Sequence, residues 1–99
     1  MKFASVRLIT SRLDELVDFY ELVTRATFER PNPVFAELLT SGGTLAIGSD
    51  ATLSLFPGTG LAAASNTSAI IEFQVDDVDE ERKRLGDRVQ VLQEPVTLP

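Results

Sequence analysis

The 99-residue sequence contains no cysteine and no histidine. Without cysteine the chain has no disulfide framework and no thiolate nucleophile, which is typical of proteins in a reducing compartment, so we expect a cytoplasmic location. Without histidine it lacks the commonest general base and every Ser-His or Cys-His arrangement. The sequence therefore offers no catalytic residue that we can assign.

Positive charge is also scarce, with 9 Lys and Arg against 15 Asp and Glu and a formal net charge of −6. Proteins that neutralise phosphates need a surplus of basic residues on one face, so a nucleic-acid partner is not expected. An acidic chain favours a cationic or neutral small organic molecule.

No apolar run approaches the roughly 20 residues of a membrane helix, and Met1-Lys2 leads straight into an alternating stretch, so neither a membrane partner nor a signal peptide is expected.

What the sequence does contain is one pattern used twice. Residues 3–10 alternate with the period of a strand, and Ser11 follows as the expected N-cap of a helix that runs to about Thr24. Two prolines then break the chain within residues 30–33. Three short strands are predicted next, as a meander: PVFAELLT (33–40), TLAIGS (44–49) and ATLSLF (51–56).

After a small-residue connector at 58–68 the pattern restarts. A strand is predicted at 70–75, Asp76 is the expected cap of a helix that ends near Leu85 before Gly86, and residues 89–92 open another strand. By length the chain 1–99 is one domain, with a first unit at 1–57 and a partial second unit at 69–99. The fold class is α+β.

The two strand-to-helix joints, LITSRLDELVDFYELV and FQVDDVDEERKRL, resemble those of the vicinal oxygen chelate superfamily. This superfamily includes glyoxalase I, bleomycin-resistance proteins, fosfomycin-resistance enzymes and extradiol dioxygenases, and the resemblance runs from Phe3 to about Glu94. It implies two βαβββ units whose sheets form one cup around the active site, with helices outside. The second unit is incomplete in this sequence, because its last strands would lie beyond Pro99.

The resemblance also implies where a metal would sit. The superfamily's ligand positions fall on Ser5, Ser54 and Ile70, and none of these is a competent ligand for a divalent metal. We therefore expect no metal and no cofactor. A run of acidic residues at 76–81 is explained by the positive end of the following helix.

By the same resemblance, Val6, Leu8, Ile71 and Phe73 face the helices, and the alternate residues line the cup. Arg7 and Glu72 occupy equivalent places in the two units. They either form a structural ion pair, or Arg7 grips an anionic or carbonyl oxygen while Glu72 holds a cation or moves a proton. The candidate ligand-binding residues are Ser5, Arg7, Phe35, Glu37, Ser54, Phe56, Ile70, Glu72 and Gln74.

Three functional hypotheses follow. The first is a metal-independent protein similar to bleomycin-resistance proteins, which holds a drug or metabolite in the cup. The second is a glyoxalase-type lyase or isomerase, or a dioxygenase, whose metal site is lost or completed outside this sequence. The third is a non-catalytic interaction module. Because an open sheet edge invites pairing, either the natural chain continues beyond Pro99 or a partner covers the edge, and we expect a homodimer.

Overall fold

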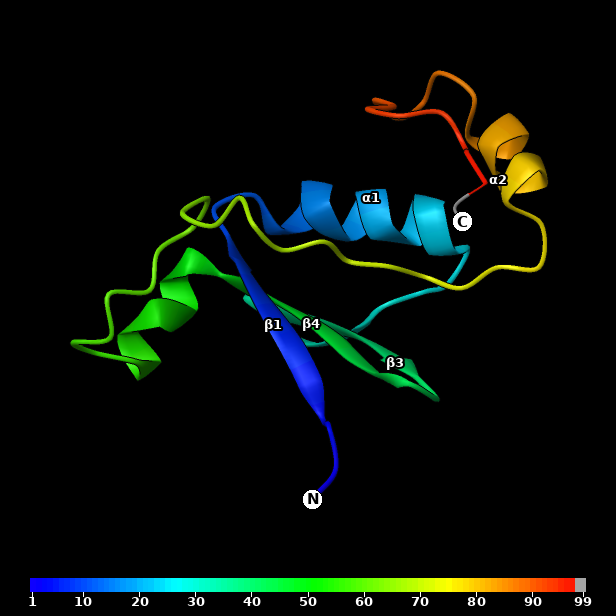
Figure 1. Cartoon of the computed structure of the whole chain (residues 1–99). Helices are drawn as coiled ribbons and strands as arrows, with labels where there is room; N and C mark the ends of the chain where they lie inside the picture. Colours follow the sequence, from blue (N-terminus) through cyan, green and yellow to red (C-terminus); the bar gives the residue numbers. More distant parts are fainter. Residues whose placement is uncertain (98–99) are drawn as a thin grey trace. The chain divides into compact units, whose positions relative to one another are not determined.

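The structure is a computed structural model that describes residues 1–97. The chain divides into two compact units, the first from Met1 to Ala69 and the second from Ile70 onward. The architecture is α+β, as predicted (Figure 1). In the first unit the elements follow the order strand, helix, strand, strand, strand and then a short 3₁₀ helix: β1 (Ser5–Thr10), α1 (Leu13–Thr24), β2 (Glu29–Asn32), β3 (Phe35–Thr40), β4 (Gly43–Ser49) and η1 (Asp50–Leu55).

The four strands form one open mixed sheet in the order β1-β4-β3-β2. β1 runs parallel to β4, whereas β3 is antiparallel to both β4 and β2. α1 supplies the crossover that brings the chain from β1 back to the sheet (Figure 1). β4, the last strand along the sequence, therefore lies in the interior of the sheet, and β1, the first strand, lies at an edge.

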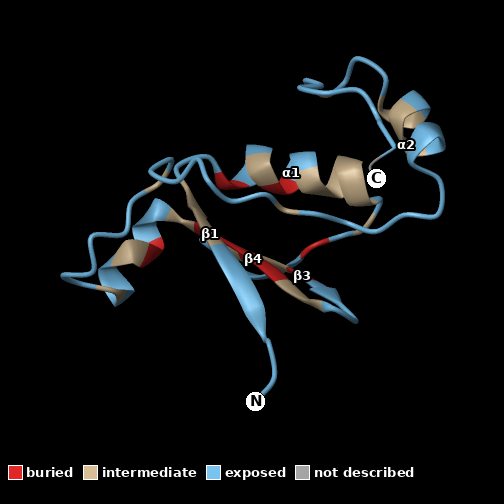
Figure 2. Ribbon diagram, in the orientation of Figure 1, coloured by how far each residue is buried: buried red, intermediate tan, exposed pale blue. Residues whose placement is uncertain are grey.

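The core lies between α1 and one face of this sheet. In β4 the residues Leu45 and Ile47 are buried, and their register partners in β3, Leu38 and Ala36, are buried as well. α1 contributes Val17, which is 1% exposed, and contacts β4 (Figure 2). Val6 and Leu8 pair with Leu45 and Ile47 and so take the helix side of β1, as predicted from the alternation.

The start of α1 differs from the prediction. Its N-cap is Arg12 rather than Ser11, and no side chain caps the helix there. Instead the Thr10 hydroxyl accepts a hydrogen bond from the Arg12 N–H at 3.0 Å. Thr10 at the end of β1 thus performs the local side-chain to backbone bonding that Ser11 was expected to perform.

One predicted strand of the meander is wrong, and one strand of the sheet was not predicted. Residues 51–55 of the segment ATLSLF lie in the 3₁₀ helix η1 rather than in a strand, and Phe56 is its C-cap. Hydroxyls bond the backbone nearby: Thr52 donates to the Ser49 carbonyl at 2.7 Å and Ser54 to the Ala51 carbonyl at 3.3 Å. The prolines within residues 30–33 are predicted to break the chain, but Pro31 lies in β2, the strand that was not predicted. β2 is an edge strand with an irregular register, where the missing N–H of proline is tolerated. The predicted strands over 33–40 and 44–49 are confirmed as β3 and β4.

The second unit contains the predicted helix, α2 (Val78–Leu85). Its N-cap is Asp77 rather than Asp76, since the Asp77 carboxylate accepts a hydrogen bond from the Glu80 N–H at 3.0 Å. Gly86 follows the helix with a positive φ of 56°, as expected of a residue that ends a helix. The predicted strands at 70–75 and 89–92 are wrong for this structure, which gives neither stretch a strand.

Across residues 1–97 the structure has no helix that is both long enough and apolar enough to cross a membrane.

Candidate functional site

The sheet face opposite α1, hereafter the open face, carries the polar side chains of the first unit. The β1 residues Ser5, Arg7 and Ile9 alternate with the helix-side residues, so all three belong to it, as predicted. Their register partners across β4 and β3 extend the face. It comprises Ser5, Arg7 and Ile9 of β1, Thr44, Ala46 and Gly48 of β4, Phe35, Glu37 and Leu39 of β3, and Glu29 of β2.

Arg7 is held by two aromatic rings on this face. Its guanidinium carbon lies 4.8 Å from the centroid of the Phe35 ring and 5.8 Å from that of Phe56. Both distances fall within the range of favourable cation–π contacts. Phe35 and Phe56 were predicted as candidate ligand residues for their ability to stack, and the structure brings both of them to Arg7.

Two small residues make this contact possible. Phe35 lies on β3 and Arg7 on β1, so the arginine side chain crosses β4, where Ala46 is the register partner of Arg7 and Gly48 is that of Phe35. Ala46 is 2% exposed although it is on the open face. Gly48 is also crowded, because an added Cβ would lie 2.9 Å from the Thr52 hydroxyl oxygen and 3.5 Å from Cδ1 of Ile9. A larger side chain at either position would obstruct the path of Arg7.

The row of register partners that begins at Arg7 on β1 ends in two carboxylates on β3 and β2. Arg7, Ala46 and Glu37 are register partners on successive strands, so the backbones of Arg7 and Glu37 stand about 10 Å apart. Glu37 in turn pairs with Glu29 on β2. Like charges directly opposite each other on antiparallel strands destabilise the pair. Within residues 1–97 neither carboxylate has an ion-pair partner within 4.0 Å, so this end of the row can accept a positive charge.

Ser54, another predicted ligand residue, is not on the sheet at all. It lies in η1 and its hydroxyl donates to the Ala51 carbonyl. Ser5 stands at the exposed start of β1. The structure therefore does not bring these two serines together as neighbouring positions of one sheet.

The remaining predicted residues, Ile70, Glu72 and Gln74, begin the second unit. All three are exposed, Ile70 by 83%, and their segment is not part of a strand. The structure describes them within their own unit only, so it does not place them with Arg7.

The residues at the positions that the resemblance assigns to a metal do not fit a metal. Two serine hydroxyls and the side chain of Ile70 offer no charged or imidazole donor. In the described part of the chain no three residues of the types His, Cys, Asp and Glu cluster in a way that could hold a metal ion. No chemical step on this face can therefore be derived through a metal.

Sequence reasoning missed four residues that shape the open face: Glu29, Ala46, Gly48 and Thr52. A period-two pattern through β4 puts Ala46 and Gly48 on one face of that strand, but only the pairing of β4 with β1 brings them to the face that carries Arg7. Glu29 could not be found, because β2 itself was not predicted. Thr52 reaches Gly48 only because its segment is a 3₁₀ helix.

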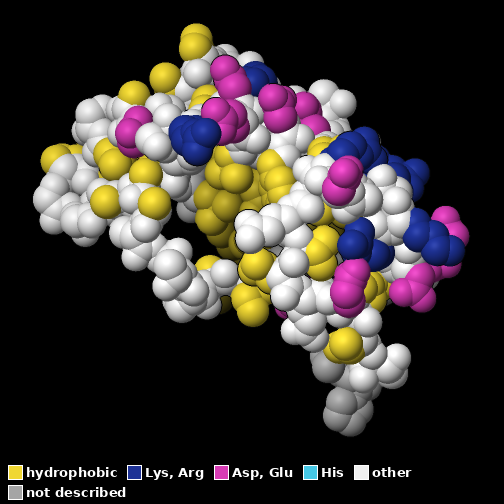
Figure 3. Space-filling model, turned by 90° about the horizontal axis from the view of Figure 1, so that it is seen from above, with side chains coloured by type: hydrophobic (Ala, Val, Ile, Leu, Met, Phe, Trp, Pro, Cys, Tyr) yellow, Lys and Arg dark blue, Asp and Glu magenta, His cyan; other side chains and the backbone are white. Residues whose placement is uncertain are grey.

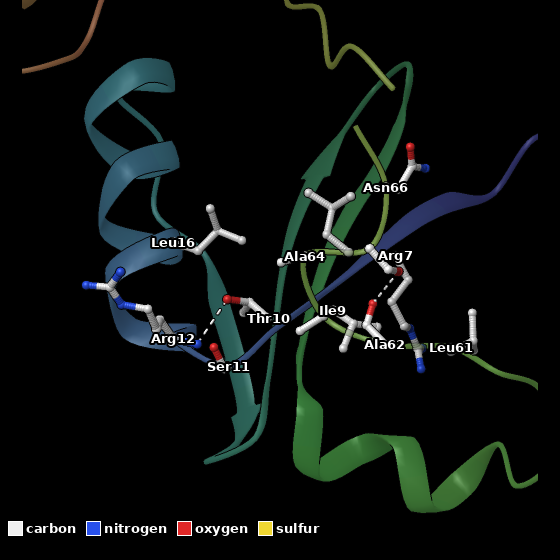
Figure 4. Close-up of a pocket in the computed structure, with 13 residues that line it drawn as sticks. Arg7, Ile9, Thr10, Ser11, Arg12, Leu16, Leu61, Ala62, Ala64 and Asn66 are labelled. Atoms are coloured by element: carbon white, nitrogen blue, oxygen red, sulfur yellow. Dashed lines mark hydrogen bonds between the residues drawn. The ribbon is translucent and has the colours of Figure 1, made fainter. Parts of the chain in front are cut away.

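A pocket of about 470 Å³ lies along β1, at the edge of the sheet. The segment from Leu61 to Asn66 forms its outer wall, and β1 with the start of α1 forms the inner wall (Figure 4). The lining is mostly apolar, with Leu8, Ile9 and Leu16 opposite Leu61 and the alanines that follow it. Its volume lies in the range of small-molecule sites.

Acidic and basic side chains are interspersed on the surface seen in Figure 3.

In comparisons with known proteins, no family model, no curated protein and no solved structure matches this chain.

Proposed function

We propose that this chain binds a small organic molecule on the open face, without a metal or cofactor, as a member of the vicinal oxygen chelate superfamily similar to bleomycin-resistance proteins. The observation that carries the proposal is the position of Arg7, which extends across β4 to the rings of Phe35 and Phe56. The order of elements in the first unit, βαβββ, is the order that the superfamily resemblance implies and supports the assignment.

The ligand is a flat, neutral or cationic molecule. Aromatic rings favour stacking with another π system, and the guanidinium of Arg7 donates hydrogen bonds to a carbonyl oxygen. Glu37 and Glu29, the carboxylates at the far end of the row, favour a positive group there. With two acidic groups and one basic group in the row, a ligand with net negative charge is disfavoured.

The resemblance supplies the rest of the proposal. The open face is one half of a cup, and the second half comes from a unit that begins at Ile70 and contributes Glu72 and Gln74. The protein acts in the cytoplasm, which the absence of cysteine supports. Its biological role is sequestration of a drug or metabolite.

The experiment that tests this function is calorimetric titration with three ligands built on one ring system. These are proflavine as a planar cation, acridine as its neutral counterpart at pH 7.5, and acridine-9-carboxylate as the anion. We expect saturable binding of proflavine and acridine and much weaker binding of the carboxylate. Equal binding of all three, or binding of none, would contradict the proposal.

A pair of charge-matched variants places the binding on the open face. E37Q removes a carboxylate from the row, and D18N removes one from the exposed surface of α1. Loss of an attraction of about 1 kcal/mol corresponds to about fivefold weaker binding of proflavine, which we expect for E37Q only. If D18N weakens binding as much as E37Q, the effect is one of net charge and the site is not on this face.

A further inference from the structure

The pocket along β1, hereafter the edge pocket, is a concave site that the proposed function does not use. Its volume of about 470 Å³ lies in the range of small-molecule sites. All of its lining residues belong to the first unit, with β1 and the start of α1 on one side and the connector from Leu61 to Asn66 on the other (Figure 4). The edge pocket is therefore formed by the first unit alone.

Apolar side chains line the edge pocket on both walls. Leu8, Ile9 and Leu16 are only partly buried by the fold, so each keeps some apolar surface open to solvent. On the opposite wall Leu61 is 52% exposed and is followed by three alanines. Covering such surface with a hydrocarbon group removes it from water, which is favourable. The pocket therefore favours a ligand with an aliphatic body.

The charged residues of the lining, Arg7 and Arg12, are both basic. The Arg12 guanidinium is already paired with the Glu15 carboxylate at 2.6 Å. Arg7 differs, because within residues 1–97 no carboxylate lies within 4.0 Å of its guanidinium. The formal net charge of −6 opposes an anion only weakly here, since exposed charges more than about 8 Å apart are largely screened at physiological salt. Arg7 thus makes the pocket complementary to one negative charge.

Arg7 is positioned to hold that charge. Its contacts with the rings of Phe35 and Phe56, at 4.8 and 5.8 Å, fix the direction of the guanidinium without using an oxygen acceptor. A guanidinium carries five N–H donors in a fixed geometry that suits a carboxylate. In Figure 4 the Arg7 side chain runs toward Leu61 of the connector, whereas the Arg12 side chain points away from the connector.

We propose that the edge pocket is a second binding site, which takes an aliphatic carboxylate. The hydrocarbon chain of this ligand lies between β1 and the connector, and its carboxylate accepts hydrogen bonds from the guanidinium of Arg7. The inference goes beyond the proposed function and does not depend on it, because the ligand has a different charge and occupies a different part of the first unit.

Calorimetric titration of the full chain with sodium decanoate tests the inference. Decyltrimethylammonium carries the same alkyl chain with a positive head group, so it is the matched control, and both are used below their micelle concentrations. We expect saturable binding of decanoate, and binding of the cation that is weaker by about tenfold or more. Equal affinity for the two would mean that the alkyl chain alone binds, and it would overturn the proposal.

Two pairs of variants locate the site. R7Q should weaken decanoate binding by about tenfold, the loss expected for a hydrogen bond between charged groups. R30Q removes the same charge from β2, outside the lining, and should leave decanoate binding unchanged. A63F places a ring on the partly buried wall of the pocket and should abolish binding. A69F adds the same ring at an exposed residue outside the lining and should leave binding unchanged.

The same variants separate this site from the open face. A63F should leave proflavine binding intact, and E37Q should weaken proflavine binding but not decanoate binding. Absence of proflavine binding would therefore contradict the proposed function alone. Circular dichroism checks that each variant is folded, and if A63F does not fold, the comparison of R7Q with R30Q decides. No saturable decanoate binding by wild type, unchanged binding in folded A63F, or equal losses in R7Q and R30Q would overturn the inference.

Discussion

Arg7 and Phe35 are in contact across an intervening strand, with 4.8 Å between the guanidinium carbon and the ring centroid. Arg7 belongs to β1 and Phe35 to β3, and β4 lies between them. The contact depends on the small side chains that β4 presents to the open face. It fixes the direction of the one basic group in the row that ends at Glu37 and Glu29.

A double-mutant cycle measures this contact. R7A and F35L should each destabilise the chain slightly, and the coupling energy between them should be about 0.5–1 kcal/mol, the size of a cation–π pair at an exposed site. Urea unfolding of the two single variants and the double variant gives the value. The cycle of R7A with F19L, which changes an exposed ring on α1, is the control and should be additive.

Additivity of R7A and F35L within the same error as the control cycle would mean that the two side chains do not interact. Phe35 would then not orient the Arg7 guanidinium on the open face, and ligand binding there would lose its main support.

Replacing Gly48 tests the crowding of the small-residue path. In G48A the added methyl group would meet the Thr52 hydroxyl oxygen at 2.9 Å, so a destabilisation of about 1–3 kcal/mol is expected from overpacking. G42A is the matched control, since the nearest atom to its added methyl would be the Thr40 hydroxyl oxygen at 3.9 Å. Thermal unfolding of the two variants should differ clearly, and equal melting temperatures would refute the packing described around Gly48.

The cap of α2 gives a prediction about the second unit. D77A removes the carboxylate that accepts the Glu80 N–H and should destabilise the helix by about 0.5–2 kcal/mol. D76A removes the same charge one residue earlier and should have a much smaller effect. Amide hydrogen exchange at Glu80 reports the difference. Faster exchange in D76A than in D77A would mean that Asp76, and not Asp77, is the N-cap of α2.

Tyr20 is the sole tyrosine of the sequence, so its ionisation can be followed by ultraviolet absorbance. Burial raises its pKa above the usual value of 10.0, because the phenolate is disfavoured away from water. A raised pKa in the folded state means that the stabilisation is complete below the unfolded pKa and is lost as the pH rises through the folded one. We expect a folded-state midpoint above that of the chain in urea, together with falling stability in that alkaline range. Coincident midpoints would show that Tyr20 is solvated.

The sequence was sufficient to predict an element where the hydrophobic periodicity and the side-chain chemistry indicated the same structure. The alternation in β1 placed Arg7 and Ile9 on one face, and the apolar stripe of α1 located its end at Thr24. These elements are governed by burial of one face, which a single sequence records directly.

Prediction failed where local hydrogen bonds or edge positions decide the structure. The hydroxyls of Thr52 and Ser54 turn a strand-like sequence into a 3₁₀ helix by bonding nearby carbonyls. Pro31 is acceptable in β2 only because β2 is at the edge of the sheet, and edge position is a property of the whole topology. For the site, the candidates Phe35, Phe56 and Glu37 depend on which strands become neighbours, so the sequence could suggest them but could not group them.

The most direct test of the central claim is an amide chemical-shift titration of the ¹⁵N-labelled chain with proflavine. Binding on the open face should shift the amides of Arg7, Phe35, Glu37 and Ala46 in a saturable way and leave those of α1, such as Asp18, unchanged. Shifts concentrated on α1, or no saturable shifts at all, would contradict the assignment of the ligand to the row that joins Arg7 to Glu37.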